Sequence, residues 1–213
     1  YAEQWLYKRK SDSLIKKYDQ WTQHLRELDD GTQLDLLELQ ALMRVYNKGL
    51  FENGQKDFKD AWSYQKASFE LTHWGLPNNM VGHIKIPKMG VKLPIYLGAT
   101  EENMNKGAVN LGQTSVPIGG ENTNCVLAAH RGYHGAAMFR DIEKLSIADE
   151  VYVTNLWEEM IYHVVEIKVI RPKETNEVLI QPGRDLITLI SCHPYRQNYQ
   201  RYVVYCERVK EMK

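Results

Sequence analysis

The sequence predicts a mainly β domain, a small barrel or sandwich rich in antiparallel strands, preceded by two helices. From Met80 onward the chain consists of short β-type runs separated by Pro and Gly. Apolar residues in the first fifty positions instead recur at helical spacing. We therefore expect residues 1–79 to form a helical hairpin with a candidate lid loop, and residues 80–213 to form the β domain.

The first predicted helix has an apolar face with a step of three or four residues, comprising Leu14, Tyr18, Trp21, Leu25 and Leu28. The second is a stretch without proline that contains Leu34, Leu37, Met43, Val45 and Leu50. Asp30-Gly31 separates the two helices, and Asn53-Gly54 ends the second. We expect the pair to support the β domain by packing.

The remaining elements follow in order. Residues 54–79 are polar with scattered aromatics, and we expect a loop with local order. The predicted strands are VGHIKIP, LPIYLG, CVLAAH, EVYVTNL, MIYHVVEIKVI, DLITLISC and RYVVYCERV. GAAMFRDIEKL interrupts them with apolar residues at helical spacing, which predicts a short helix or turn.

The composition excludes some functions. Lys plus Arg and Asp plus Glu both total 27, so no basic surplus favours binding to nucleic acid. No apolar run approaches the roughly 18 residues of a membrane span. Because the sequence starts without Met inside a helical pattern, we expect it to be the ectodomain of a longer protein with a membrane anchor elsewhere.

Cys192 lies where a predicted strand ends, because His193-Pro194 follows it and proline has no N–H to donate. Arg201 begins the next predicted strand and can lie beside Cys192 on an antiparallel neighbour. Cys125 and Cys206 lie within predicted strands, and we interpret both as structural. A disulfide between those two is an alternative.

His130 also ends a predicted strand. A thiol with an ordinary pKa of about 8.5 needs a neighbouring imidazole or cation to react at neutral pH. Spacing alone indicates a Cys192–His130 pair only weakly, because the chain has seven histidines. His193 is a competing imidazole, although side chains of adjacent strand residues point to opposite faces.

Two segments carry a family resemblance. TLISCHPYRQNYQR, residues 188–201, resembles the sortase signature of T-L-x-T-C followed by an arginine, and AAHRGYHGAAMFRDIEKL, residues 128–145, resembles the sortase histidine segment. The similarity extends over residues 82–123, which resemble the opening strands of that family, and so covers about residues 80–210.

The resemblance implies an eight-stranded β-barrel at the surface of a Gram-positive cell. We expect no cofactor, whereas calcium, which some sortases use, is an alternative that the acidic loop residues Glu101, Glu102 and Glu121 leave open. It implies cleavage of an LPxTG-like sorting signal between Thr and Gly and transfer of the new acyl end to an amine. By the same resemblance Cys192 is the nucleophile, His130 the acid/base and Arg201 the cation that holds the substrate carbonyl or oxyanion. The implied partners are pilins or surface proteins bearing the signal, and an amine acceptor.

The helical pair, the HRG segment and the residues between Cys192 and Arg201 are most similar to class C, pilin-polymerising sortases, which use a pilin lysine as acceptor. Class B sortases, which attach proteins to peptidoglycan, are the alternative. The chain departs from the pattern at three positions. The departures are Ser191, where Thr is usual, His193, where Thr or Ser is usual, and Arg196, where Gly is frequent. These three residues and Asn198 are candidate pocket residues.

Class C sortases often have a lid with an Asp-Pro-aromatic tip, and this chain has no such triplet. Its most similar string is Asp60-Ala61-Trp62, in the irregular stretch before the β domain. We therefore treat Asp60 and Trp62 as candidate lid residues that pair with Arg201 and cover Cys192. An ordinary exposed loop is the alternative.

Other functional classes predict different features of the sequence or of Cys192. A sortase-like binding or assembly module would have an unreactive Cys192. A papain-like protease would place its cysteine on a helix and before its histidine, the reverse of the order here. His130 and His134 have the spacing of two metal ligands on a helix, but a third ligand is not evident in the sequence.

Overall fold

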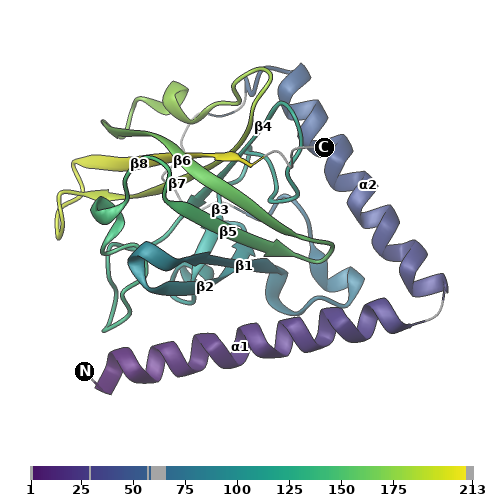
Figure 1. Cartoon of the computed structure of the whole chain (residues 1–213). Helices are drawn as coiled ribbons and strands as arrows, with labels where there is room; N and C mark the ends of the chain where they lie inside the picture. The colour runs from purple at the N-terminus through teal and green to yellow at the C-terminus, as the bar shows by residue number, and fades with distance from the viewer. Residues whose placement is uncertain (1, 29, 57, 59–65, 210–213) are drawn as a thin grey trace.

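The computed structural model describes residues 2–28, 30–56, 58 and 66–209. Its strands are β1 Met80–Ile86, β2 Val91–Leu97, β3 Ala108–Asn110, β4 Thr123–Ala128, β5 Glu150–Asn155, β6 Glu159–Ile170, β7 Asp185–His193 and β8 Gln200–Arg208. They close into a barrel in the order β1-β2-β3-β4-β7-β8-β6-β5 (Figure 1). β2 pairs with β3, and β4 with β7, in parallel, whereas the other neighbours are antiparallel. The prediction of a mainly β barrel is confirmed.

Seven of the eight strands coincide with β-type runs in the sequence, whereas β3 does not. β3 has only three residues, too few to show an alternating pattern. It joins β2 on one side and β4 on the other and so closes the gap between them. Buried aliphatic and aromatic side chains form the core, among them Ile84, Ile95, Phe139, Tyr162 and Tyr205.

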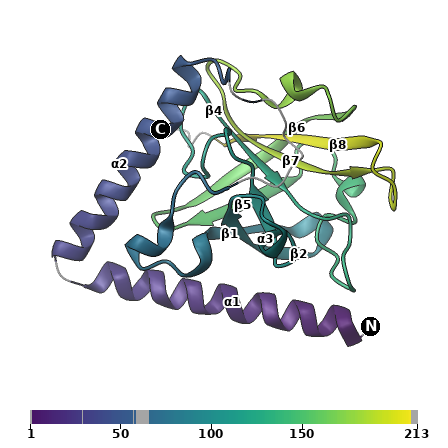
Figure 2. The same ribbon diagram turned by 180° about the vertical axis from the view of Figure 1, so that it is seen from behind.

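The two predicted helices are present as α1, Ala2–Glu27, and α2, Asp30–Glu52. They diverge from their connection, α1 beneath the barrel and α2 along one side of it (Figures 1 and 2). Each is tied to the barrel by polar contacts: Tyr18 Oη donates to the Val81 carbonyl at 2.7 Å, and Asn47 exchanges two hydrogen bonds with the Val116 backbone. Among the described helices, none is both long and apolar enough to cross a membrane.

The described part of residues 54–79 is irregular apart from two 3-10 turns, η1 Leu71–Trp74 and η2 Pro77–Asn79. Gln55 anchors its start, because its side chain donates to the Gln113 carbonyl and accepts from the Ile180 N–H. The candidate lid residues Asp60 and Trp62 lie outside the described residues.

The predicted helix or turn after β4 is a series of turns that ends in the 3-10 helix η4, Ile142–Lys144. Met138 has a positive φ of 41°, which is incompatible with a continuous α-helix. The helical spacing reflects burial instead, since the four apolar residues are all buried: Met138, Phe139, Ile142 and Leu145. The other short helices are η3 Pro87–Met89, α3 Glu101–Met104 and η5 Thr175–Val178.

Candidate active site

Parallel pairing of β4 with β7 brings His130 and Cys192 to the same end of the barrel. Ala128 is the partner of Ile190 in this register, and the Ala129 N–H donates to the Ile190 carbonyl at 3.3 Å. His130 and Cys192 each lie two residues beyond that pair. β4 ends at Ala128, so the structure places both residues at this end of the barrel, His130 in the segment that follows β4 and Cys192 on β7.

Antiparallel pairing of β7 with β8 brings in Arg201, which lies directly opposite Cys192. Its Nη1 donates to the carbonyls of Asn198 at 2.7 Å and Gln200 at 2.9 Å, which turns the guanidinium toward the β7–β8 connection. His130, Cys192 and Arg201 thus lie on three adjacent chain segments at one end of the barrel.

Cys192 differs from the other two cysteines in its accessibility. It is partly exposed, whereas Cys125 and Cys206 are buried, and burial raises the pKa of both of their thiols. Cys125 and Cys206 are both register partners of Ile187, on opposite sides of β7. Two strand spacings separate them, more than a disulfide spans, and all three cysteines are free. The alternative of a disulfide between those two is therefore wrong.

His130 is partly buried under an aromatic ring. Tyr133 stacks on its imidazole, with ring centroids 4.7 Å apart and an interplanar angle of 15°. Desolvation lowers the pKa of His130 below its ordinary value of 6.5. The imidazole therefore stays neutral to lower pH than a solvated histidine, a state that can accept a proton.

His193 belongs to a different cluster from His130. Its Nδ1 lies 2.8 Å from a carboxylate oxygen of Glu143, and its ring contacts Tyr202. Tyr202 is the register partner of Ser191, so His193 shares the face of Ser191 and not that of Cys192. This geometry does not support His193 as the imidazole partner of the thiol.

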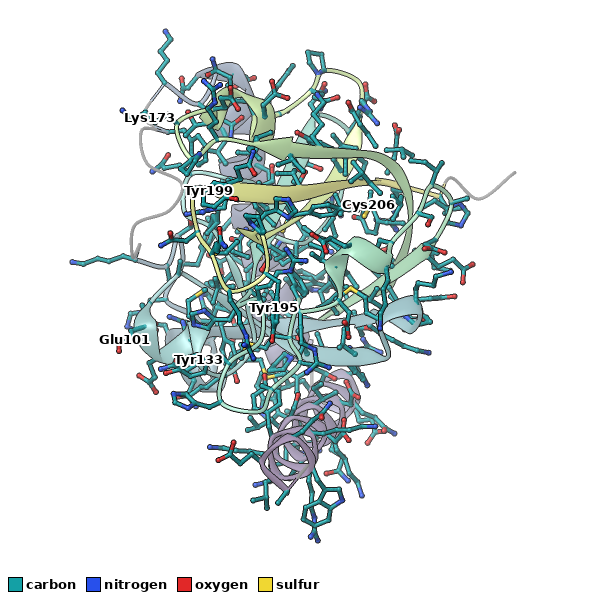
Figure 3. All side chains as sticks on the ribbon, turned by 90° about the vertical axis from the view of Figure 1, so that its left-hand side faces the viewer. Glu101, Tyr133, Lys173, Tyr195, Tyr199 and Cys206 are labelled. Atoms are coloured by element: carbon teal, nitrogen blue, oxygen red, sulfur yellow. The ribbon has the colours of Figure 1, made fainter. Side chains whose placement is uncertain are left out.

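The β7–β8 connection presents aromatic side chains around the site. Figure 3 views this end of the barrel, with Tyr133, Tyr195 and Tyr199 labelled on it. Tyr195 and Tyr199 are exposed, and the Arg196 guanidinium lies over the Tyr195 ring. Arg196 has a positive φ of 66°, a conformation that glycine adopts without steric cost, which explains why glycine suits this position.

The structure does not place His130 and His134 on a helix, which their spacing as two metal ligands would require. The segment that carries His130 and His134 is bent and contains a bridge between Tyr133 and Ala136, and is not helical. Across the described ranges, no group of three or more His, Cys, Asp or Glu side chains could hold a metal ion.

Comparison with known proteins places this geometry in a family. Residues 84–209 match the model of the sortase domain. The chain belongs to the sortase family. Sortase A of Bacillus anthracis is 30% identical over 82% of each chain, and sortase A of Listeria monocytogenes is 31% identical over 76% of this chain and 73% of its own.

Solved sortase structures share the whole architecture, including the N-terminal helices. Sortase C-1 from Streptococcus pneumoniae is 35% identical, with a TM-score of 0.80 over 94% of this chain and 100% of that one. Sortase C1 of GBS pilus island 1 is 30% identical, with the same TM-score over 95% and 94%. The similarity to class C sortases is confirmed, and sortases are cysteine transpeptidases found at Gram-positive cell surfaces.

The sequence prediction of a cysteine transpeptidase is thereby confirmed. The papain-like alternative is wrong, because Cys192 lies on a β-strand. Three residues near the site were not singled out from the sequence: Tyr133, Arg131 and Glu143. Arg131 and Tyr133 lie within the histidine segment that carries the resemblance, but their contacts depend on tertiary structure.

Proposed function

We propose that this sortase cleaves an LPxTG-like sorting signal with Cys192 as nucleophile, His130 as acid/base and Arg201 as oxyanion cation. The observation that carries the proposal is that the pairing of β4 with β7 brings His130 and Cys192 to one end of the barrel, where Arg201 lies opposite Cys192 on β8. The burial of Cys125 and Cys206 leaves Cys192 as the thiol that a peptide can reach.

The chemistry has two acyl-transfer steps. His130 takes the proton of the Cys192 thiol as the sulfur adds to the threonine carbonyl, and it gives that proton to the leaving amine as the Thr–Gly amide bond breaks. A thioester then links substrate and enzyme. An incoming amine gives a proton to His130 and attacks the thioester, which restores the thiol. Arg201 stabilises the negative charge on oxygen in both steps.

We propose a pilin lysine as the acceptor amine, because the similar solved structures over nearly the full chain are of sortases C1 and C-1, one of them from a pilus island. The class B alternative predicts a peptidoglycan amine. A competition experiment tests the choice of acceptor. The enzyme is incubated with a labelled LPxTG-type peptide and equal amounts of two acceptors, a pilin-derived lysine peptide and a peptidoglycan cross-bridge peptide. We expect the lysine isopeptide as the main product by mass spectrometry. Preferential transfer to the cross-bridge amine would support class B.

We also propose that the segment containing Asp60 and Trp62 acts as a lid over Cys192. One similar structure, 29% identical with a TM-score of 0.75, is described as the lid-mutant of Streptococcus agalactiae sortase C1, so that enzyme has a lid. A lid predicts that Trp62→Ala increases peptide hydrolysis and the rate of Cys192 alkylation. Unchanged rates in both assays would remove the lid proposal.

We propose that the enzyme acts at the outer face of the cell membrane, because sortases are enzymes of the Gram-positive cell surface. The alternative of a non-catalytic module predicts that Cys192 does not react with thiol reagents at neutral pH.

A further inference from the structure

β7 extends beyond the end of its parallel neighbour β4 at the position of Cys192. The Ile190 carbonyl still accepts from the Ala129 N–H. Carbonyls two residues apart point to the same edge of a strand, so the Cys192 carbonyl faces the edge where β4 has already ended at Ala128. Arg131 takes the place of the missing strand, because its Nη1 donates to the Cys192 carbonyl at 3.0 Å.

The Arg131 guanidinium is held in one orientation by further contacts. Its side chain is only 5% exposed, its Nε donates to the Arg140 carbonyl at 3.1 Å, and its Nη2 lies 2.8 Å from Glu143 Oε2. A buried, planar guanidinium with donors committed in three directions has little freedom to reorient. The carbonyl of Cys192 is therefore fixed relative to the loop that follows His130.

Glu143 also contacts His193, the residue that follows Cys192. Its second oxygen lies 2.8 Å from His193 Nδ1, which donates its proton to the carboxylate. Arg131 Nη1 also lies 3.3 Å from His193 Nδ1. Because that nitrogen carries the proton donated to Glu143, it cannot accept a hydrogen bond from Arg131. The hydrogen bond from Arg131 lowers the pKa of Glu143, so the carboxylate stays charged at neutral pH. Glu143 thus binds the arginine and the strand end together.

We propose that Arg131 is a positioning residue that fixes the Cys192 backbone for acyl transfer, and that Glu143, which also binds His193, holds Arg131 in place. The inference rests on the proposed role of Cys192 as nucleophile. Arg131 acts through the Cys192 carbonyl and not on the substrate. A nucleophile displaced by about 1 Å loses on the order of 100-fold in rate, so a loose strand end affects the chemical step more than substrate binding.

The test compares Arg131→Met, Arg131→Lys and a matched control, Lys144→Met. Lys144 is 63% exposed, pairs with Asp141 and lies on the same segment as Glu143. We would measure kcat and KM for hydrolysis of an LPxTG-type peptide well below the Tm of each variant, and the rate of Cys192 alkylation by iodoacetamide. Arg131→Met is expected to lower kcat by about 10- to 100-fold with KM within about twofold. Arg131→Lys should recover part of the loss, and Lys144→Met should match the wild type.

The inference is overturned if Arg131→Met lowers Tm but has the same kcat and the same alkylation rate as Lys144→Met. Arg131 would then have a purely structural role. If Arg131→Met does not fold, Glu143→Gln replaces it, and an unchanged kcat in that variant overturns the inference equally. Cys192→Ala, measured in parallel, separates the two proposals. Activity that persists in Cys192→Ala contradicts the proposed function, whereas activity lost there but kept in Arg131→Met contradicts only the positioning role. If the wild type does not turn over the peptide, an unchanged alkylation rate in Arg131→Met overturns the inference.

Discussion

The protonation of His130 depends on the aromatic ring that covers it. Because burial lowers its pKa, the imidazole should titrate below 6.5 in an NMR experiment. Tyr133→Ala removes the stacked ring and exposes the imidazole, so the midpoint should rise toward 6.5. Tyr133→Phe keeps the stack and should leave the midpoint where it is in the wild type. An unchanged midpoint in Tyr133→Ala would show that the ring does not control the solvation of His130.

The same pKa shift links His130 to stability. The folded state binds the proton less readily than the unfolded chain, whose histidine has the ordinary pKa of 6.5. The favourable contribution of the neutral imidazole is thus complete above that pH and is lost as the pH falls below it. Urea unfolding between pH 5 and 8 should show this loss, and a His130→Gln variant should show a smaller one.

Arg196 gives a second prediction for a single residue. Its left-handed backbone costs about 1–2 kcal/mol for a residue with a Cβ, and the greater flexibility of unfolded glycine offsets part of any gain. We expect Arg196→Gly to raise the free energy of unfolding by about 0.5 kcal/mol. Arg196→Ala keeps the Cβ and should give no such gain in a thermal melt. Equal stabilities of the two variants would contradict the strain argument.

The sequence indicates three candidate catalytic residues but not the contacts that support them. Cys192, His130 and Arg201 stand at predicted strand ends, and a family motif contains each of them. Arg131 contacts a backbone carbonyl 61 positions away, and a carbonyl leaves no trace in the sequence. In the sequence Glu143 is indistinguishable from an ordinary surface carboxylate. Only the folded turns after β4 bring it beside Arg131 and His193.

Among the elements, α2 depends on one buried amide. The Asn47 side chain donates to the Val116 carbonyl and accepts from the Val116 N–H, and it is 4% exposed. Asn47→Ala leaves a buried donor and acceptor unpaired, at a cost of about 1–3 kcal/mol each before water or local movement compensates. We expect a loss of about 2–3 kcal/mol in unfolding free energy by urea titration.

Lys48→Ala is the matched control for Asn47→Ala, since Lys48 is 74% exposed and makes only a weak pair with Glu52. It should change stability by less than about 0.5 kcal/mol. Equal effects of both substitutions would mean that α2 does not rely on this contact.

α1 and most strands follow from their apolar periods, whereas α2 follows from a proline-free stretch in which Leu37 and Val45 turn out to be exposed. The arrangement of the helices was not predicted, because contacts such as that of Tyr18 with Val81 are hydrogen bonds to distant backbone groups. β3 was not predicted because three residues carry no period. The spacing of Met138, Phe139 and Ile142 predicted burial correctly without an α-helix.

At the scale of the whole molecule, the helices and barrel should unfold as one unit, because buried polar contacts join α1 to β1 and α2 to the connection between β3 and β4. Thiol accessibility reports this directly. The native protein should react with Ellman's reagent at one thiol, Cys192, and the unfolded protein at three. The two buried thiols should become reactive in the same urea range in which helical CD is lost. Labelling of Cys206 before that transition would indicate that the barrel opens independently.

The central claim is that Cys192 forms the thioacyl intermediate, and mass spectrometry of the enzyme incubated with an LPxTG-type peptide tests it most directly. We predict an adduct with the mass of the peptide's acyl part, mapped by digestion to Cys192, released by an added amine and absent in Cys192→Ala. A Cys125→Ala variant should still form the adduct. An adduct on another residue, or none in either the wild type or Trp62→Ala, would contradict the account.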